Sequence, residues 1–245
     1  MTAIETLQDK LSDGSATIGV IGLGYVGLPL AIAAAKAGFP TLGFDIDPEK
    51  PAAIAEGRSY LRHIPGEALA ETVQDGRLSA TTDFARLSEP DVVVICVPTP
   101  LTRHREPDLS YLLATARDIA AALRPGQLVV LESTTYPGTT DEAVRPILEE
   151  TGLMAGRDFL LAFSPEREDP GNASFTTTTI PKVVGADTPE ARAAAEAFYS
   201  RIVERVVMVA DTRTAETVKL TENIFRAVNI ALVNELKLIC EPMGV

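Results

Sequence analysis

Short apolar runs alternate with amphipathic segments along most of this chain. Apolar runs predict strands over residues 17–21, 40–44, 78–81, 91–97, 127–131, 159–163, 182–185 and 206–209. Apolar residues at helical spacing predict helices near the N-terminus and over residues 48–56, 64–75, 109–123, 139–151 and 189–202. The run DVVVICV (91–97) is apolar throughout, as a strand covered on both faces requires. This alternation predicts an α/β fold: a Rossmann-like, doubly wound, mainly parallel sheet with helices on both faces.

The C-terminal part of the chain follows a different pattern. Apolar side chains recur at helical spacing from about Thr214 to Met243, at Val218, Phe225, Val228, Leu232, Leu236 and Ile239. They predict one long helix, longer than most helices of globular proteins. We therefore expect a Rossmann-like domain over residues 1–210 and the start of a long helix over 211–245.

A glycine-rich turn joins the first predicted strand to an apolar helix. Its sequence is Gly22-Leu23-Gly24-Tyr25-Val26-Gly27, and the next predicted strand ends in Asp45, 18 residues after Gly27. This order and spacing match the dinucleotide fingerprint, in which a pyrophosphate lies on the helix N-terminus. The Asp45 carboxylate is placed to accept hydrogen bonds from the adenosine ribose and to repel a 2′-phosphate, which favours NAD over NADP. The alternative is a glycine-rich turn that binds nothing.

Composition narrows the range of partners. The 245 residues carry a formal net charge of −12, which argues against nucleic acid and anionic membrane as general partners. Two cysteines, Cys96 and Cys240, provide no disulfide framework and suit a reducing cytosol, and Cys96 is interpreted as a small buried apolar residue. No apolar run approaches 18 residues, and the first 15 residues do not resemble a secretory leader, so we expect a cytoplasmic protein. His63 and His104 show no metal-ligand spacing, and no metal site is expected.

Five polar residues are candidates for chemistry. Thr99, Thr134 and Glu166 each follow a predicted strand and should lie at the edge of the sheet where ligands bind. Hydroxyls there are equally typical of turns, and a carboxylate is equally typical of a helix start. Lys219 and Asn223 are four residues apart, so they share one helix face, where an ammonium and an amide could stabilise an oxyanion. That face could also simply be solvated.

Six motifs, in order, resemble the nucleotide-sugar 6-dehydrogenases, the family of UDP-glucose and GDP-mannose dehydrogenases. They are GVIGLGYVGLPLA (19–31), GFDIDPEK (43–50), VVICVPTPL (93–101), LESTTYPGTT (131–140), AFSPERE (162–168) and VKLTENIFRAVNIALVNE (218–235). The resemblance covers essentially the whole chain. It implies two successive NAD-dependent oxidations that convert the C6 alcohol of a UDP-sugar to the uronic acid. In bacteria the products of this family commonly feed the synthesis of surface polysaccharides.

The resemblance also implies roles for individual positions. The pyrophosphate is assigned to Gly22, Gly24, Tyr25, Val26 and Gly27, the adenosine ribose to Asp45 and Lys50, and the nicotinamide half to Pro98, Thr99 and Thr134. Thr134 would also position a water, and Glu166 would be the base that activates water to hydrolyse a thioester. Lys219 and Asn223 would stabilise the oxyanion at C6. The substrate would be bound by Glu166, Arg167, Lys219 and Asn223.

The resemblance also bears on the sugar substrate and on the assembly of the protein. CVPTPLTRHREPDLSY and SPEREDPGNASF are similar to the branch that oxidises UDP-N-acetylglucosamine. UDP-glucose, UDP-N-acetylgalactosamine and UDP-N-acetylmannosamine remain alternatives. Pro170 stands where the UDP-glucose branch has a second glutamate, so that role is not transferred. The family's nucleophilic cysteine and its C-terminal UDP-binding domain are expected beyond Val245. We therefore expect the chain to be part of a longer enzyme and, by itself, to bind NAD without completing catalysis. The long helix is the family's dimer core, so a homodimer is expected. A non-catalytic NAD-binding module is the alternative.

Overall fold

A mainly parallel sheet forms the centre of the protein. The computed structural model describes residues 2–62, 64–166 and 178–245, and within them the sheet has eight strands in the order β3-β2-β1-β4-β5-β6-β7-β8. The strands are β1 (Ile18–Ile21), β2 (Thr41–Phe44), β3 (Leu78–Thr81), β4 (Val92–Ile95), β5 (Leu128–Leu131), β6 (Leu160–Phe163), β7 (Lys182–Ala186) and β8 (Val206–Val209). Neighbouring strands are parallel except β6 and β7, which run antiparallel with Phe163 opposite Gly185.

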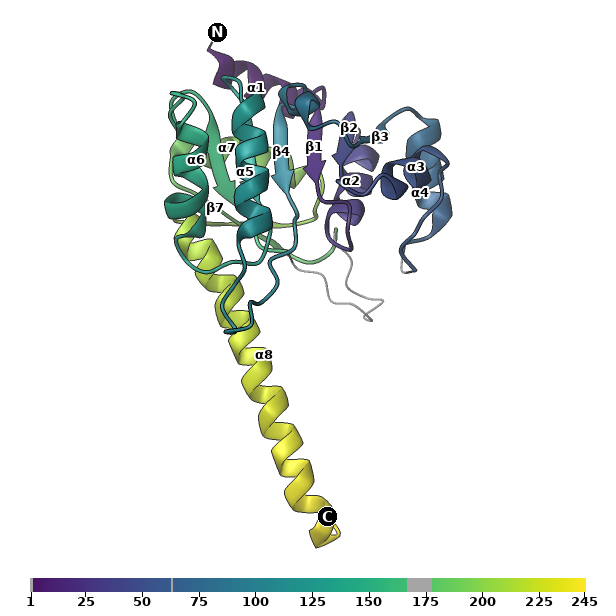
Figure 1. The fold of residues 1–245 in the computed structure, drawn as a ribbon, viewed down its shortest axis with the longest axis vertical. Coiled ribbons are helices and arrows are strands. Elements are labelled where there is room, and N and C mark those ends of the chain that lie inside the picture. Colours follow the sequence, from purple (N-terminus) through teal and green to yellow (C-terminus); the bar gives the residue numbers. More distant parts are fainter. Residues whose placement is uncertain (1, 63, 167–177) are drawn as a thin grey trace.

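Helices cover both faces of this sheet (Figure 1). They are α1 (Ala3–Asp13), α2 (Gly27–Lys36), α3 (Glu49–Ala55), α4 (Gly66–Gln74), α5 (Ser110–Ala122), α6 (Arg145–Glu149), α7 (Pro189–Ser200) and α8 (Thr212–Cys240), with short 3₁₀ helices η1 (Phe84–Ser88) and η3 (Glu241–Met243) and a π-helix η2 (Thr139–Val144). Side-chain caps define several starts. Thr2 and Glu5 form a capping box at α1, and Asp211 accepts a hydrogen bond from Thr214 N at 2.7 Å to begin α8.

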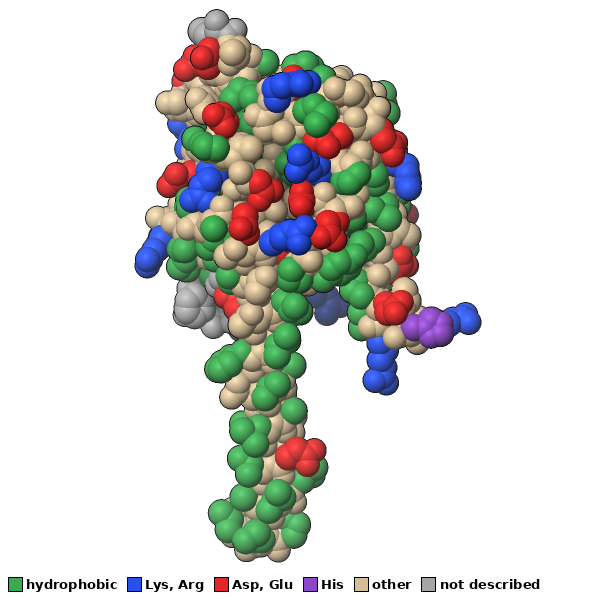
Figure 2. All heavy atoms as spheres, turned by 90° about the vertical axis from the view of Figure 1, so that its left-hand side faces the viewer, with side chains coloured by type: hydrophobic (Ala, Val, Ile, Leu, Met, Phe, Trp, Pro, Cys, Tyr) green, Lys and Arg blue, Asp and Glu red, His purple; other side chains and the backbone are tan. Residues whose placement is uncertain are grey.

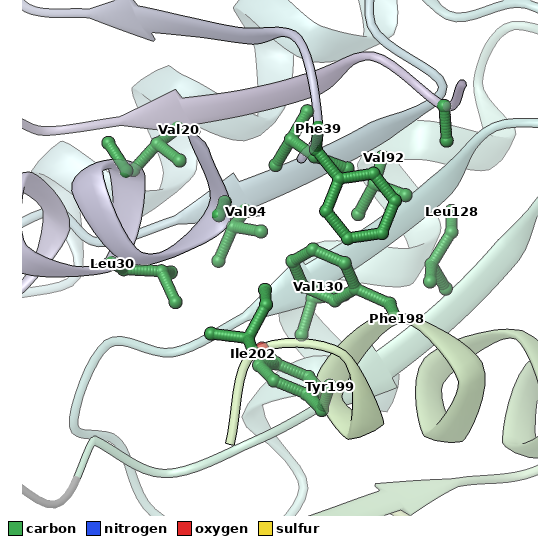
Figure 3. Close-up of a cluster of buried hydrophobic side chains, with 14 of the residues drawn as sticks. Val20, Leu30, Phe39, Val92, Val94, Leu128, Val130, Phe198, Tyr199 and Ile202 are labelled. Atoms are coloured by element: carbon green, nitrogen blue, oxygen red, sulfur yellow. The ribbon is translucent and has the colours of Figure 1, made fainter. Parts of the chain in front are cut away.

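The core has two halves because successive strand residues point to opposite faces. Val94 and Val130 face one half, where Phe39, Phe198 and Tyr199 pack over the sheet (Figure 3). The neighbouring strand residues, such as Val93 and Val129, face α5 and α6 on the other side. Burying each such side chain contributes about 1.5–3 kcal/mol, so the central strands form a rigid platform for the loops at their carboxyl ends.

The predicted fold class is confirmed, and the predicted elements match the observed ones with small shifts at their ends. Cys96 lies one residue beyond β4 rather than inside the strand. The helix predicted over 139–151 begins as the π-helix η2 and continues as α6. The irregular loop predicted over 172–179 lies mostly outside the described residues.

Helix α8 projects from the body of the protein (Figure 1). Only its first turns are buried, at Thr212, Ala215 and Glu216. Farther along, apolar side chains cover the helix surface (Figure 2), and those most exposed include Phe225, Val228, Leu232, Val233, Leu238 and Ile239. No helix in the described part of the chain is long and apolar enough to cross a membrane.

Candidate active site

A cavity of about 730 Å³ opens at the carboxyl ends of the central strands. Its lining residues come from the β1–α2 turn, the end of β2, the loops after β4, β5 and β6, and helix α5. The strand order reverses between β1 and β4, the place where open α/β sheets bind ligands. The predicted residues that line it are Gly22, Gly24, Tyr25, Val26, Asp45, Lys50, Pro98, Thr99, Thr134 and Glu166. Ten of the predicted positions thus share one cavity.

The glycine-rich turn leaves room for a ligand. Gly22 has φ +90°, a conformation that favours glycine, and a Cβ there would meet the Cys96 carbonyl oxygen at 2.6 Å. A Cβ on Gly27 would overlap the Gly22 carbonyl oxygen, so Gly27 permits close packing of helix and strand and does not line the cavity. A Cβ on Gly24 would meet nothing within 4 Å. Helix α2 starts here with no side-chain cap and no acid in its first turn, which suits an anionic group such as a pyrophosphate.

Asp45 fixes the turn as well as facing the cavity. Its carboxylate is 5% exposed and accepts hydrogen bonds from Leu23 N at 2.8 Å and Asp47 N at 3.0 Å. The Lys50 ammonium lies 2.8 Å from the same carboxylate. Asp45 therefore joins the end of β2 to the glycine-rich turn, a role that the sequence did not predict.

Two threonines hold adjacent loops together at the other end of the cavity. Thr99 Oγ1 donates to the Thr134 carbonyl oxygen at 2.6 Å, so the hydroxyl of Thr99 joins the loops after β4 and β5. Ser133 Oγ reinforces this contact by donating to the Val97 carbonyl oxygen at 2.7 Å. Both threonines also line the cavity, as predicted.

Glu166 and Lys219 form an ion pair at the same end. Lys219 Nζ lies 3.2 Å from Glu166 Oε2 and 2.7 Å from the Glu166 carbonyl oxygen, and both side chains are 12% exposed. The structure thus brings together residues 53 positions apart in the chain. Among the described residues, the cavity lining includes Glu166 but neither Lys219 nor Asn223, which is half-buried one turn farther along α8. Arg167, predicted to bind substrate, lies outside the described residues.

A second set of polar groups behind this end was not predicted. The Glu132 carboxylate is 2% exposed; it lies 2.9 Å from Lys182 Nζ and accepts a 2.5 Å hydrogen bond from the Tyr199 hydroxyl. Burial, followed by the charge of Glu132, raises the pKa of Cys96 and of Tyr199 well above their ordinary values. Cys96 packs against the apolar core as predicted, but it is half-buried and lines the cavity, so it is less buried than the sequence predicted. The available sequence signal was a carboxylate directly after a buried strand.

Glu216 is another unpredicted buried carboxylate. It accepts hydrogen bonds from Gly138 N at 2.5 Å, Thr140 N at 2.9 Å and Thr140 Oγ1 at 2.7 Å. Desolvation raises its pKa, although these hydrogen bonds oppose the shift. Glu216 lies one turn before Lys219, so it fastens the start of α8 to the loop that carries Thr134.

Comparison with known proteins agrees with this geometry. Residues 16–203 match the NAD-binding domain of the UDP-glucose/GDP-mannose dehydrogenase family, and residues 213–245 match that family's central domain. The chain is 36% identical over 230 residues to a UDP-N-acetyl-D-glucosamine 6-dehydrogenase of Pseudomonas aeruginosa, covering 93% of this chain and 54% of the relative. It is 39% identical over 229 residues to a UDP-N-acetyl-D-mannosamine dehydrogenase of Pyrococcus horikoshii, with coverage of 93% and 54%. The chain therefore spans about half the length of these relatives.

Solved structures show the same fold. The structure of a UDP-N-acetylmannosamine dehydrogenase from Pyrococcus horikoshii matches with a TM-score of 0.86 and 40% identity over 94% of this chain and 55% of that one. A ternary complex of GDP-mannose dehydrogenase from Pseudomonas aeruginosa matches with a TM-score of 0.84 and 31% identity over 89% and 51%. The chain belongs to the UDP-glucose/GDP-mannose dehydrogenase family, and it carries that family's NAD-binding domain, with NAD as its cofactor.

Proposed function

We propose that this chain provides the cofactor site and part of the catalytic site for NAD-dependent oxidation of the C6 alcohol of a UDP-sugar to the uronic acid. The observation that carries this proposal is the Lys219–Glu166 ion pair at the end of the cavity that holds Thr99 and Thr134. A module that only binds NAD has no need of a half-buried cation and carboxylate at that end. Residues 1–210 would form the NAD-binding unit and 211–245 the start of the helix that supports catalysis.

The roles follow from the positions of these groups. Bound NAD supplies the hydride acceptor. Hydride can leave C6 once the hydroxyl proton has passed to water, which places negative charge on the C6 oxygen. The Lys219 ammonium with the Asn223 amide would stabilise that charge. After the second oxidation, the Glu166 carboxylate would take a proton from a water that Thr134 positions. That water would attack the C6 thioester on the cysteine expected beyond Val245, and the cysteine thiolate would leave as the uronic acid forms. Both side chains are only 12% exposed, so water screens them weakly, and each charge acts most strongly on a group in direct contact with it.

UDP-N-acetylglucosamine is the substrate we favour. The basis is the similarity of residues 96–111 and 164–175 to the branch that oxidises this sugar nucleotide. The names of similar proteins span the N-acetylglucosamine, N-acetylmannosamine and N-acetylgalactosaminuronic acid derivatives, so the choice of epimer is the first matter to test.

The test is NADH formation, followed by absorbance, with each UDP-N-acetylhexosamine and with UDP-glucose, on the protein that carries these 245 residues. We expect the largest kcat/KM with UDP-N-acetylglucosamine. Lys219→Met should lower kcat by about 10²- to 10³-fold, as loss of one oxyanion donor does elsewhere, with partial recovery in Lys219→Arg. Lys237→Met, on the exposed end of the same helix, is the matched control. Full activity in Lys219→Met would refute the assignment, and NAD binding without turnover of any sugar nucleotide would favour a binding module.

We also propose that α8 pairs with a second copy of the chain. A helix that is apolar on most of its surface is normally covered, and Phe225 is 71% and Val233 63% exposed. Light scattering should give the mass of a dimer, and Phe225→Asp with Val233→Asp should give the mass of a monomer without loss of NAD affinity. A monomeric unsubstituted chain would contradict this pairing.

A further inference from the structure

The buried ion pair of Glu132 and Lys182 lies at the wall of the cavity, which Glu132 lines, and has no role in the chemistry described above. Both side chains are almost inaccessible, at 2% and 7% exposed. Removing two charges from water is costly, and apolar residues of similar size are often at least as stable in such places. Stability alone therefore gives little reason for an ion pair here.

The contacts of this pair reach both loops that carry proposed active-site residues. Glu132 is two residues before Thr134, and it lines the cavity itself. Lys182 Nζ also donates to the Pro165 carbonyl oxygen at 3.3 Å, directly before Glu166. One ammonium thus connects the loop after β5 to the loop after β6.

The antiparallel strand explains how a lysine reaches this position. β7 pairs antiparallel with β6, with Phe163 opposite Gly185 and Ala162 opposite Ala186. Its first residue, Lys182, therefore lies at the edge where β6 ends. In a parallel strand the first residue would lie at the opposite edge of the sheet, far from the cavity.

Helix α7 holds the pair from the other side. The Tyr199 hydroxyl donates to Glu132 Oε1 at 2.5 Å, and Lys182 Nζ lies 5.2 Å from the centre of the Tyr199 ring. Tyr199 is fully buried in the core that covers this face of the sheet. Figure 3 shows its ring among the apolar side chains of that core. The carboxylate and the ammonium are therefore each held by a second contact, which leaves little freedom in their spacing.

From this geometry we infer that Lys182 is a positioning residue: paired with Glu132, it sets the spacing between the Thr134 loop and Glu166, and so shapes the end of the cavity that takes the nicotinamide half of NAD. This inference rests on the proposed function, which assigns the nicotinamide half of NAD to the end of the cavity that holds Thr134 and Glu166. It does not depend on the identity of the sugar substrate.

The test compares two ligands that differ only in the nicotinamide ring. NAD and ADP-ribose are titrated calorimetrically into the unsubstituted chain and into Lys182→Met. We expect the Kd of NAD to rise about tenfold, as for the loss of one or two hydrogen bonds, and the Kd of ADP-ribose to stay within twofold. Lys182→Arg should recover most of the NAD affinity. Lys10→Met is the matched control. Lys10 Nζ pairs with Asp91 Oδ1 at 3.0 Å, at the opposite edge of the sheet from the cavity, so its loss should change the Kd of neither ligand.

A second variant covers the case in which Lys182→Met leaves Glu132 buried without its cation and does not fold. Lys182→Met with Glu132→Gln removes both charges and keeps an acceptor for Tyr199, so it should fold and show the same selective loss of NAD affinity. Equal Kd values for NAD in this variant and the unsubstituted chain, or equal weakening of both ligands, would overturn the inference. Failure of the proposed function would appear separately, as absence of sugar-nucleotide oxidation while the selective loss of NAD affinity persists.

Discussion

Gly24→Val offers a direct test of how the cavity holds the cofactor. A side chain at this position meets no protein atom within 4 Å at its Cβ, so we expect the variant to fold with an unchanged Tm. Gly24 nevertheless lines the cavity beside the start of α2, where a pyrophosphate approaches the backbone. The substitution therefore separates ligand binding from folding.

The size of the effect follows from the contacts that the valine blocks. Hydrogen bonds from backbone N–H groups to a charged phosphate contribute about 1.5–3 kcal/mol each. Loss of two raises the free energy of binding by about 3–6 kcal/mol, which is roughly a 10²- to 10⁴-fold rise in the Kd of NAD. Gly27→Ala should behave differently, because its Cβ overlaps the Gly22 carbonyl oxygen and the protein itself is destabilised.

Calorimetric titration with NAD, with thermal unfolding of each variant, gives both quantities. Gly66→Val is the matched control: its Cβ also meets nothing within 4 Å, and Gly66 begins α4 rather than lining the cavity. Its Kd for NAD should equal that of the unsubstituted chain. A Kd for Gly24→Val within threefold of that value, with an unchanged Tm, would refute this placement of the pyrophosphate.

Three further predictions concern single carboxylates and one hydroxyl. Asp45→Asn removes the negative charge beside Lys50 but keeps the shape of the side chain. The ratio of the Kd of NADP to the Kd of NAD should therefore fall at least tenfold. An unchanged ratio would contradict the role of Asp45 in the choice of cofactor. Thr135 Oγ1 is buried with no hydrogen-bond partner among the described residues; Thr135→Val should raise the free energy of unfolding by about 1 kcal/mol in urea titrations, and a decrease would show that the hydroxyl has a partner in solution. Burial opposes ionisation of Asp91, but hydrogen bonds from the Thr17 amide, Arg124 and Lys10 outweigh it and hold its pKa below the ordinary 3.8. The stability that Asp91 contributes is therefore present above pH 3.8 and is lost as the pH falls through the lowered pKa. Asp91→Asn should be less stable than the unsubstituted chain at neutral pH and equally stable in strong acid. A difference in the free energy of unfolding that does not change with pH would contradict this role of Asp91.

The cofactor half of the site could be predicted because its signals are local. The glycine-rich turn and Asp45 belong to one strand–helix–strand unit, and the backbone conformation that this unit needs restricts which residues can occupy it. The cavity lining now includes these residues at the expected edge of the sheet. Their roles in binding stay predictions until ligand affinities are measured.

The polar groups behind the site could not be predicted in this way. An apolar run such as Lys182–Ala186 predicts a strand but carries no information on its direction, and only the antiparallel pairing of β7 brings Lys182 to Glu132. The Glu216 carboxylate likewise meets Gly138 and Thr140 only after α8 has packed against η2. Such contacts join residues about 50 and 78 positions apart, and helical or strand periodicity reports nothing at that range.

The most direct test of the account is a crystal structure of the chain with NADH. We predict that the pyrophosphate lies on the turn at Gly24, and that the nicotinamide ring lies at the end formed by Thr99, Thr134 and Glu166, with its reactive face turned toward Lys219. A nicotinamide ring bound away from Glu166 and Lys219 would contradict the proposed catalytic arrangement, even if the adenosine half occupied the expected place.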